Sequence, residues 1–129
     1  VETLFLRKAL AGEILEVSGG KSNSRDFLYV TEAVEGLRLA ISNFGKIKGY
    51  AVNLGSGVET HISSLAEIIC GLLDIDSDLI RVSEGKQSVR FQANIELAKS
   101  LIGFKSQITV RNGLEIILNS LRKAQVSDR

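Results

Sequence analysis

Hydrophobic and polar positions along this chain follow the helical period in five stretches. The strongest predicts an amphipathic helix whose apolar side chains recur at i, i+3, i+4, i+7 and i+8. These side chains are Leu65, Ile68, Ile69, Leu72 and Leu73. Weaker stretches predict a first helix ended by Gly12, a helix after Thr31, a helix from Asn94 to Gly103, and a last helix after Thr109.

The pattern also predicts how these helices begin and pack. Thr31, Asn94 and Thr109 are expected N-caps, and Ser64 with Glu67 has the spacing of a capping box, although that cap can lie anywhere from 60 to 64. The helix after Thr31 is expected to bury Val34, Leu37 and Ile41. The last helix is expected to bury Leu114, Ile117, Leu118 and Leu121.

Short β-prone runs alternate with the helices and predict strands. The runs are 14–17, 27–30, 50–54 and 79–83, with a brief extended piece at 108–110. Strands that alternate with helices imply βαβ units. We therefore predict an α/β fold with a small, mostly parallel sheet and helices, without a long linker.

Composition narrows the class of protein. The 129 residues are 44% hydrophobic and 24% charged, which is enough to build one domain around its own core. A net charge of +1 removes the usual argument for nucleic-acid binding, and no apolar run approaches the ~18 residues of a membrane span. The single Cys favours a reducing compartment, so we expect a cytoplasmic protein. The chain starts at Val1 without Met, which either Met excision or a longer parent chain explains.

One acidic turn imitates a calcium site. Asp74, Asp76 and Asp78 have the spacing of the first ligands of an EF-hand loop, but Leu79 stands where the turn needs glycine. Gly85 stands where the bidentate glutamate belongs. We interpret the segment as a solvated turn and expect no metal site.

A second motif imitates a cofactor site. The turn 55–57 (Gly-Ser-Gly) lies between an expected strand and a helix, but Thr60 replaces the third glycine of a dinucleotide-binding turn. His61 has no partner at metal-ligand spacing and is expected at a helix entry. Cys70 lies among apolar residues and is expected in the core. The sequence therefore contains no recognisable catalytic constellation.

A glycine-rich loop at 19–24 delivers Arg25 and Asp26 to an apolar run. Arginine suits bidentate contact with phosphate, and N–H groups of such a loop can add to it. From these residues alone, a surface loop with an Arg–Asp pair remains the alternative.

Five weak motifs follow one order over essentially the whole chain. They are Arg-Asp-Phe-Leu-Tyr-Val at 25–30, Tyr-Ala-Val-Asn-Leu-Gly-Ser-Gly at 50–57, Ser-Ser-Leu-Ala-Glu at 63–67, Ala-Asn-Ile-Glu-Leu-Ala-Lys-Ser-Leu-Ile-Gly-Phe at 93–104, and Asn-Gly-Leu at 112–114. Together they resemble the C-terminal part of extended short-chain dehydrogenases, the NAD-dependent sugar-nucleotide epimerase/dehydratase family. The order and spacing of the motifs carry this resemblance.

The resemblance implies a function for this part of the fold. Residues 1–124 would form the C-terminal lobe that binds the nucleotide sugar, followed by a polar tail at 125–129. The N-terminal Rossmann domain that binds NAD has no counterpart in the chain. By resemblance, two arginines clamp the diphosphate, an aromatic ring lies near the sugar, and a strand end meets the nucleobase. These implied residues are Arg25, Arg90, Phe91, Glu16, Val17 and Ser18.

The chain also departs from the family pattern at specific positions. The family's Arg-x-Gly-Asp is replaced by Ser-Glu-Gly-Lys at 83–86, so that both its Arg and its Asp are missing. Ser18 replaces an aromatic residue that would stack on the base, and Glu32 replaces the second Asp of Tyr-Val-Asp-Asp. The identity of the nucleotide is therefore open.

The residues that would perform redox chemistry are missing from this sequence. The family's Tyr-x-x-x-Lys is absent, since Tyr29 is followed four residues on by Ala33, and Tyr50 by Leu54. In such enzymes this Tyr acts as general base while NAD takes the hydride. We therefore expect no catalytic residue and no cofactor in this chain, which would be inactive alone, whereas the parent enzyme uses NAD(P).

Two interpretations of function remain open at this point. The chain is either the substrate-binding portion of an epimerase, dehydratase or ketoreductase, or a non-catalytic α/β binding module derived from that lobe. The first makes a nucleotide sugar and the missing Rossmann domain its partners. Because the resemblance places 50–54 at the edge of a larger sheet, we also expect this segment to be exposed and to favour homodimerisation or rearrangement.

Overall fold

The computed structural model describes residues 1–20, 22–84 and 89–127, with side chains up to Lys123. The elements in chain order are α1 (Glu2–Leu10), β1 (Leu15–Ser18), β2 (Ser24–Asp26), α2 (Val30–Ser42), α3 (Phe44–Ile47), β3 (Glu59–His61), α4 (Ile62–Leu73), η1 (Ser77–Leu79), β4 (Ile80–Ser83), α5 (Glu96–Ile102) and α6 (Val110–Ser127). The prediction of an α/β fold is confirmed. The last helix continues into the segment that the sequence suggested as a polar tail.

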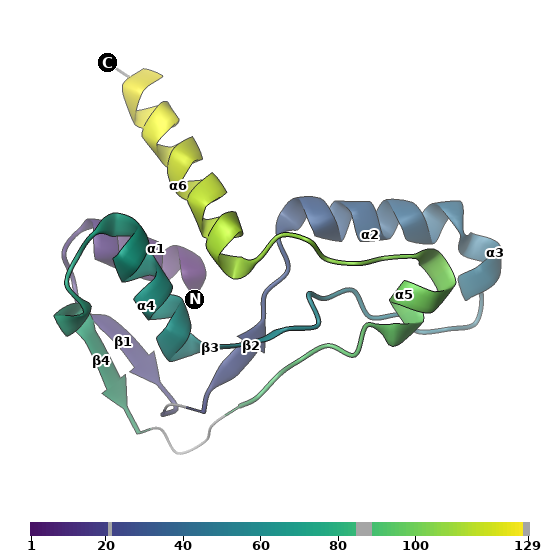
Figure 1. Ribbon diagram of the computed structural model, residues 1–129, viewed down its shortest axis with the longest axis horizontal. Helices are drawn as coiled ribbons and strands as arrows, with labels where there is room; N and C mark the ends of the chain where they lie inside the picture. The colour runs from purple at the N-terminus through teal and green to yellow at the C-terminus, as the bar shows by residue number, and fades with distance from the viewer. Residues whose placement is uncertain (21, 85–88, 128–129) are drawn as a thin grey trace.

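The described strands form two separate pairs. β1 and β4 are parallel, with Leu15 beside Ile80, and α4 lies in the connection between them. β2 and β3 are antiparallel, with Arg25 opposite Thr60. Figure 1 shows β2 and β3 between two groups of helices, α1 and α4 on one side and α2, α3 and α5 on the other. Within the described ranges the sheet is therefore two small ladders, only one of them parallel.

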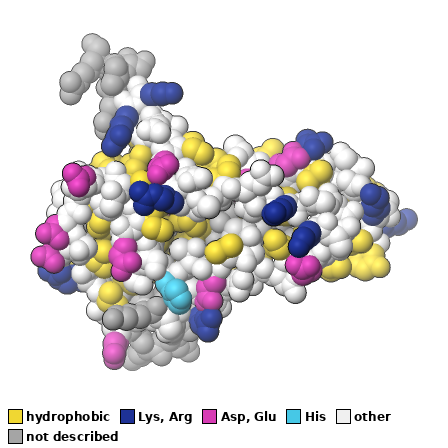
Figure 2. Space-filling view, in the orientation of Figure 1, with side chains coloured by type: hydrophobic (Ala, Val, Ile, Leu, Met, Phe, Trp, Pro, Cys, Tyr) yellow, Lys and Arg dark blue, Asp and Glu magenta, His cyan; other side chains and the backbone are white. Residues whose placement is uncertain are grey.

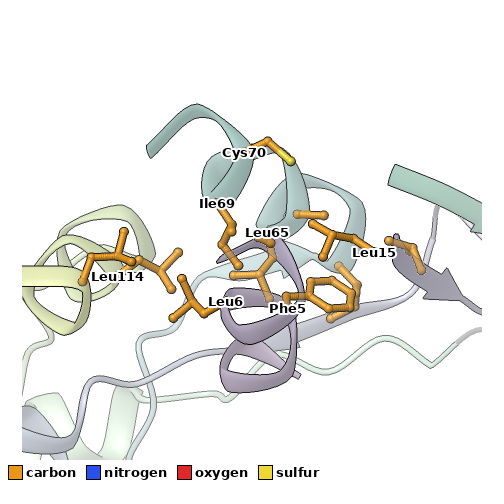
Figure 3. Close-up of a cluster of buried hydrophobic side chains, with 12 residues drawn as sticks. Phe5, Leu6, Leu15, Leu65, Ile69, Cys70 and Leu114 are labelled. Carbon is orange, nitrogen blue, oxygen red and sulfur yellow. The ribbon is translucent and has the colours of Figure 1, made fainter. Parts of the chain in front are cut away.

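The larger core lies where α1, α4 and α6 meet β1. Leu15 and Val17 are fully buried while Glu16 and Ser18 are exposed, the alternation of a strand with one covered face. Leu65 and its neighbours on α4 pack against this face, as Figure 3 shows. The expected amphipathic helix is confirmed, and Cys70 is buried on it, where desolvation raises the pKa of its thiol.

A second, smaller core lies at the other end of the molecule. Ala98, Ile102 and Phe104 are buried there. α2 contributes Gly36, because a methyl group at this position would lie 2.8 Å from the Leu54 side chain. The close approach of helix and loop therefore depends on the missing side chain.

Three expected extended segments are not strands. Residues 27–29 are irregular and Val30 begins α2, so the strand lies earlier, in β2. Residues 50–54 are also irregular, because no described strand lies beside them to bond their N–H and C=O groups. Residues 108–109 are irregular too, and Val110 begins α6. Conversely, β3 is a polar segment that the pattern missed, and its pairing with β2 is what makes it a strand.

The expected caps are partly confirmed. The Thr109 hydroxyl accepts a hydrogen bond from the Asn112 N–H at 3.2 Å at the start of α6, as expected. The Asn94 side chain accepts one from the Glu96 N–H at 3.0 Å, but Ile95 holds the N-cap position of α5, so Asn94 lies one residue before it. Thr31 is not a cap, because Tyr29 holds that position. α4 begins after His61, as expected for a helix-entry residue, and the proposed capping box lies inside the helix.

The apolar face of α2 is exposed, which contradicts the expectation of burial. Val34, Leu37 and Ile41 are each more than half exposed, and Val30 and Phe44 extend the same stripe. We call these five residues the α2 stripe. Figure 2 shows hydrophobic side chains at the surface near the end formed by α3 and α5. In α6, Leu114 and Leu118 are buried and Ile117 partly so, but Leu121 is exposed.

No helix within the described ranges combines the length and the apolar character needed to cross a bilayer.

Candidate functional site

Arg25 lies on β2, where its guanidinium contacts a segment far away in the sequence. Its Nη1 donates to the side-chain oxygen of Asn23 at 3.0 Å, to the Ser24 carbonyl at 2.7 Å and to the Val89 carbonyl at 2.9 Å. The Ser24 N–H also donates to the Val89 carbonyl, at 3.0 Å. β2 therefore holds the backbone that carries Arg90, and the structure brings the two predicted arginine segments together.

Asn23 connects this cluster to the end of β1. Its side-chain nitrogen donates to the Ser18 carbonyl at 2.9 Å, while its side-chain oxygen accepts from Arg25. The backbone of Asn23 also accepts from the Ile62 N–H at 2.9 Å. Among the predicted residues, Ser18 and Arg25 are thus joined through one side chain that no motif singled out.

Arg90 is engaged by a carboxylate of β3. Its Nε and Nη2 each donate to one oxygen of Glu59 at 2.7 Å, a bidentate ion pair. The buried Ser24 hydroxyl donates to the same carboxylate. The hydrogen bonds from Arg90, then from Ser24, lower the pKa of Glu59 to about 2. Glu59 is therefore ionised near neutral pH beside the predicted phosphate-binding arginine, and nothing in the sequence pattern indicated it.

Asp26 has a structural role. Its carboxylate accepts from the backbone N–H groups of Ser56 at 2.7 Å, Gly57 at 3.0 Å and Ala93 at 3.1 Å, and from the Ser56 hydroxyl at 2.6 Å. One side chain therefore fixes two segments of the chain, the 55–57 turn and the backbone at Ala93, against the end of β2.

The turn 55–57 does not fit a dinucleotide cofactor. The N–H groups of Ser56 and Gly57, which would face a pyrophosphate, are bonded to Asp26. A methyl group at Gly55 would lie 2.5 Å from the Cβ of Ala93, so this glycine serves close packing within the chain. The expectation of a strand-to-helix turn is wrong, because irregular backbone precedes the turn and β3 follows it. No step involving NAD can be derived from these contacts.

The other predicted residues lie at different depths. Val17 is fully buried in the larger core, backbone included, where it pairs with Val82 of β4. Glu16 and Ser18 are exposed along β1, and Phe91 is exposed next to Arg90 in the sequence. The counterpart of the family's Arg-x-Gly-Asp lies mainly outside the described residues, since 85–88 are not described.

Two hollows lie close to this cluster without including either arginine. One, of about 270 Å³, is mostly apolar and is lined by residues that include Phe27, Tyr29, Leu65 and Leu114. The other, of about 420 Å³, runs from the 55–57 turn to the start of α5. Gln92 lines it and donates to the Gly57 carbonyl at 2.6 Å. Gln92, which lines the second hollow, directly follows Arg90 and Phe91 in the sequence.

The remaining candidate residues also have structural positions. Asp74 caps α4 in the left-handed conformation, and the Asp76 carboxylate accepts from the Asp78 N–H at 2.9 Å. No cluster of metal-ligating side chains occurs in the part of the chain that the structure describes. In that same part, Nδ1 of His61 is the one buried side-chain polar atom without a hydrogen bond.

Comparisons with known proteins bear on the sequence and on the fold. No family model matches the sequence. UDP-glucuronic acid decarboxylase 1 of Xenopus tropicalis is 32% identical over 120 residues, which cover 92% of this chain and 28% of that protein. A putative UDP-glucose 4-epimerase of Methanocaldococcus jannaschii is 27% identical over 124 residues, 95% of this chain and 39% of that protein.

Solved structures of epimerases also match this chain over part of their length. An epimerase from Methanothermobacter thermautotrophicus superimposes with a TM-score of 0.74 at 29% identity over 89% of this chain and 34% of its own. A UDP-glucose 4-epimerase of Thermotoga maritima, solved with UDP-glucose, reaches a TM-score of 0.80 at 22% identity, over 96% of this chain and 40% of its own.

The fold and the sequence therefore match an α/β portion of extended short-chain dehydrogenases. More specifically, the chain is homologous to part of the NAD-dependent sugar-nucleotide epimerases and dehydratases, which confirms the resemblance. It spans between 26% and 39% of the length of the curated relatives it matches.

Proposed function

We propose that residues 1–124 form the C-terminal, substrate-binding lobe of a nucleotide-sugar epimerase, dehydratase or ketoreductase. In this proposal Arg25 and Arg90 bind the diphosphate, Phe91 lies near the sugar, and the end of β1 meets the base. The observation that carries the proposal is the double contact of β2 with the Val89 carbonyl, from Ser24 and from Arg25. It brings two arginine segments 65 positions apart in sequence to one place.

The donors of Arg25 support this assignment. Its three hydrogen bonds to described residues all use Nη1, so that Nε and Nη2 have no hydrogen-bond acceptor among the described residues. Those donors form a fork that suits a phosphate. Ser18 and Glu16, exposed at the end of β1, lie on the strand that Asn23 connects to Arg25.

Calorimetric titration of the 129-residue chain with UDP, dTDP, GDP and CDP sugars tests the proposal. We expect one nucleotide to be preferred and Arg25→Ala to weaken its binding by about tenfold or more, because a charge-assisted contact to phosphate is lost. Arg38→Ala is the control, since Arg38 forms an exposed pair with Glu35 on α2, away from this cluster. Unchanged affinity in Arg25→Ala would contradict the role of Arg25.

We further propose that the chain alone has no oxidoreductase activity. Its sequence lacks Tyr-x-x-x-Lys, and its one Gly-Ser-Gly turn is occupied by Asp26. A dinucleotide domain of the parent enzyme would supply the hydride acceptor and the general base. Detectable reduction of NAD by the purified chain with any of the four nucleotide sugars would refute this.

The α2 stripe and the irregular 50–54 segment fit the same proposal. In a larger enzyme the dinucleotide domain would cover both. It would pack against the α2 stripe, and one of its strands would pair with residues 50–54. In the isolated chain they favour association of copies. Genomic sequence directly upstream of the codon for Val1 tests this, because an open frame encoding a glycine-rich βα turn and Tyr-x-x-x-Lys is expected.

The alternative is a non-catalytic binding module derived from this lobe. It is favoured by the loss of both the Arg and the Asp from the family's Arg-x-Gly-Asp at 83–86. A stop codon upstream in place of the dinucleotide domain, together with retained nucleotide binding, would select this alternative.

A further inference from the structure

Glu59 faces another carboxylate across the β2–β3 ladder. It lies directly opposite Asp26, and residues that are opposite in an antiparallel pair project from the same face. Two like charges in this arrangement repel each other. Asp26 is compensated by backbone N–H groups, and Glu59 is compensated by Arg90 and Ser24. In the absence of a ligand, the ion pair with Arg90 therefore offsets the repulsion between the Glu59 and Asp26 carboxylates.

The two arginines reach the ladder from different faces. Side chains alternate along a strand, so Arg25 leaves β2 on the face opposite to Asp26 and Glu59. Arg90 in its ion pair lies with Glu59, and this pair uses its Nε and one of its terminal nitrogens. Convergence of both arginines on one diphosphate therefore requires Arg90 to leave Glu59.

We propose that Glu59 competes with the nucleotide diphosphate for Arg90, so that binding replaces a carboxylate by a phosphate on one guanidinium. This inference rests on the proposed function, in which Arg90 contacts the diphosphate. Arg90 is the mobile partner, since its side chain is 68% exposed and that of Glu59 only 18%. Glu59 stays on β3, where Ser24 continues to donate to it. The charged and titratable groups around Glu59 are Arg90, Asp26 and His61.

A charge-neutral substitution of Glu59 tests the competition. Glu59→Gln keeps an acceptor for Ser24 but removes the charge that holds Arg90. We expect the Kd for UDP to fall by about fivefold to tenfold, because Arg90 becomes free and one negative charge leaves the site. The matched control is Glu35→Gln, which removes the same charge from another bidentate Arg–Glu pair, that of Arg38 on α2.

Two further measurements isolate the role of Arg90. Inorganic pyrophosphate, which has no base or sugar, should show the same relative gain as UDP. In an Arg90→Ala background, the gain from Glu59→Gln should shrink to about twofold or less, since the double-mutant cycle removes the coupled partner and leaves only the loss of one negative charge. Should Glu59→Gln fail to fold by circular dichroism, Glu59→Asp keeps the charge but shortens the side chain. It is then expected to tighten binding by a smaller factor.

The outcomes separate this inference from the function on which it rests. Unchanged or weaker binding of UDP in Glu59→Gln, with wild-type binding intact, overturns the competition and leaves the proposed function standing. A gain of undiminished size in the Arg90→Ala background also overturns it, because the effect would not act through Arg90. Absence of binding by wild type and by every Glu59 variant overturns the proposed function and the role of Glu59 together.

Discussion

Replacement of Glu32 should remove the hydrogen bonds that connect α2 to the segment before α6, and so lower the stability of the fold. Glu32 lies in the first turn of α2, is 8% exposed, and accepts hydrogen bonds from the Ser106 hydroxyl at 2.6 Å, from the Gln107 N–H, and from the Ile108 N–H at 3.0 Å. It therefore connects α2 to the segment that leads into α6. In Glu32→Ala, two backbone donors lose their acceptor.

The cost can be worked out from these contacts. A donor left without a partner costs roughly 1–3 kcal/mol when it is buried, so two of them give an upper bound near 6 kcal/mol. Gln107 is exposed and Ile108 only half-buried, so the actual cost lies well below this bound. Water can reach part of the space that the side chain leaves, and we expect a loss of about 2–4 kcal/mol in the free energy of unfolding. Glu32→Gln keeps one acceptor oxygen and should cost about 1 kcal/mol, the difference between a charged and a neutral hydrogen bond. Urea unfolding followed by circular dichroism measures both.

The pH dependence gives an independent check. Burial by itself raises the pKa of Glu32, but hydrogen bonds from Gln107, Ser106 and Ile108 outweigh it, and the pKa lies below its usual 4.5. A carboxylate with a lowered pKa stabilises the fold above its unfolded-state pKa, and this contribution is lost as pH falls through the folded-state value. The stability difference between wild type and Glu32→Gln should therefore be full near neutral pH and shrink below about pH 4.5.

The control for Glu32 is Glu35 on the same helix. Glu35 is exposed and pairs only with Arg38 among the described residues. Glu35→Ala should leave the unfolding midpoint unchanged, because exposed ion pairs contribute little. Equal destabilisation by Glu32→Ala and Glu35→Ala, or a pH-independent difference for Glu32→Gln, would refute the reasoning.

Other substitutions address the turn and the exposed helix face. Gly55→Ala should cost about 1–3 kcal/mol of stability by overpacking against Ala93, and Ala93→Gly should recover part of it in the double variant; additive losses would contradict the contact. Leu37→Lys and Ile41→Lys on the α2 stripe should leave the unfolding midpoint unchanged but lower self-association measured by sedimentation velocity, since both side chains are already exposed. A wild-type chain that is monomeric at high concentration would contradict the expected association.

Elements whose partners lie within the chain were predictable from the sequence. α4 buries its apolar face against β1 and α1, so its periodicity reports a contact that exists. The segment 50–54 has the composition of a strand, but a strand needs a neighbour for its backbone groups, and no described segment provides one. The α2 stripe has helical periodicity without a covering surface in the structure. The strand expected at 50–54 and the burial expected for the α2 stripe fail for one physical reason. A hydrophobic pattern indicates that a segment can pack or pair, but it does not specify which surface the segment contacts.

The sequence singled out Arg25 and Arg90 as candidates, but not the carboxylate that engages Arg90. Arg25 and Arg90 stand in recognisable motifs, and long-range contacts bring their segments together. Glu59 lies in a polar stretch without strand signal, and only the register of β3 against β2 places it beside Arg90. Asn23 was hidden in a glycine-rich loop, where its link between Ser18 and Arg25 depends on a turn that the pattern does not specify.

The residues that carry the family resemblance fall into two groups, those that hold the fold together and those with groups available to a ligand. Asp26 and Gly55 fix the turn after residue 54, and Gly113 is packed so closely that a methyl group there would lie 3.1 Å from the Tyr29 ring. Such residues preserve a fold whether or not it binds a nucleotide. Arg25 has the opposite character, because part of its guanidinium has no described acceptor. The motif matches therefore argue for the fold, whereas the choice between an enzyme lobe and a derived module depends on whether the arginines bind phosphate.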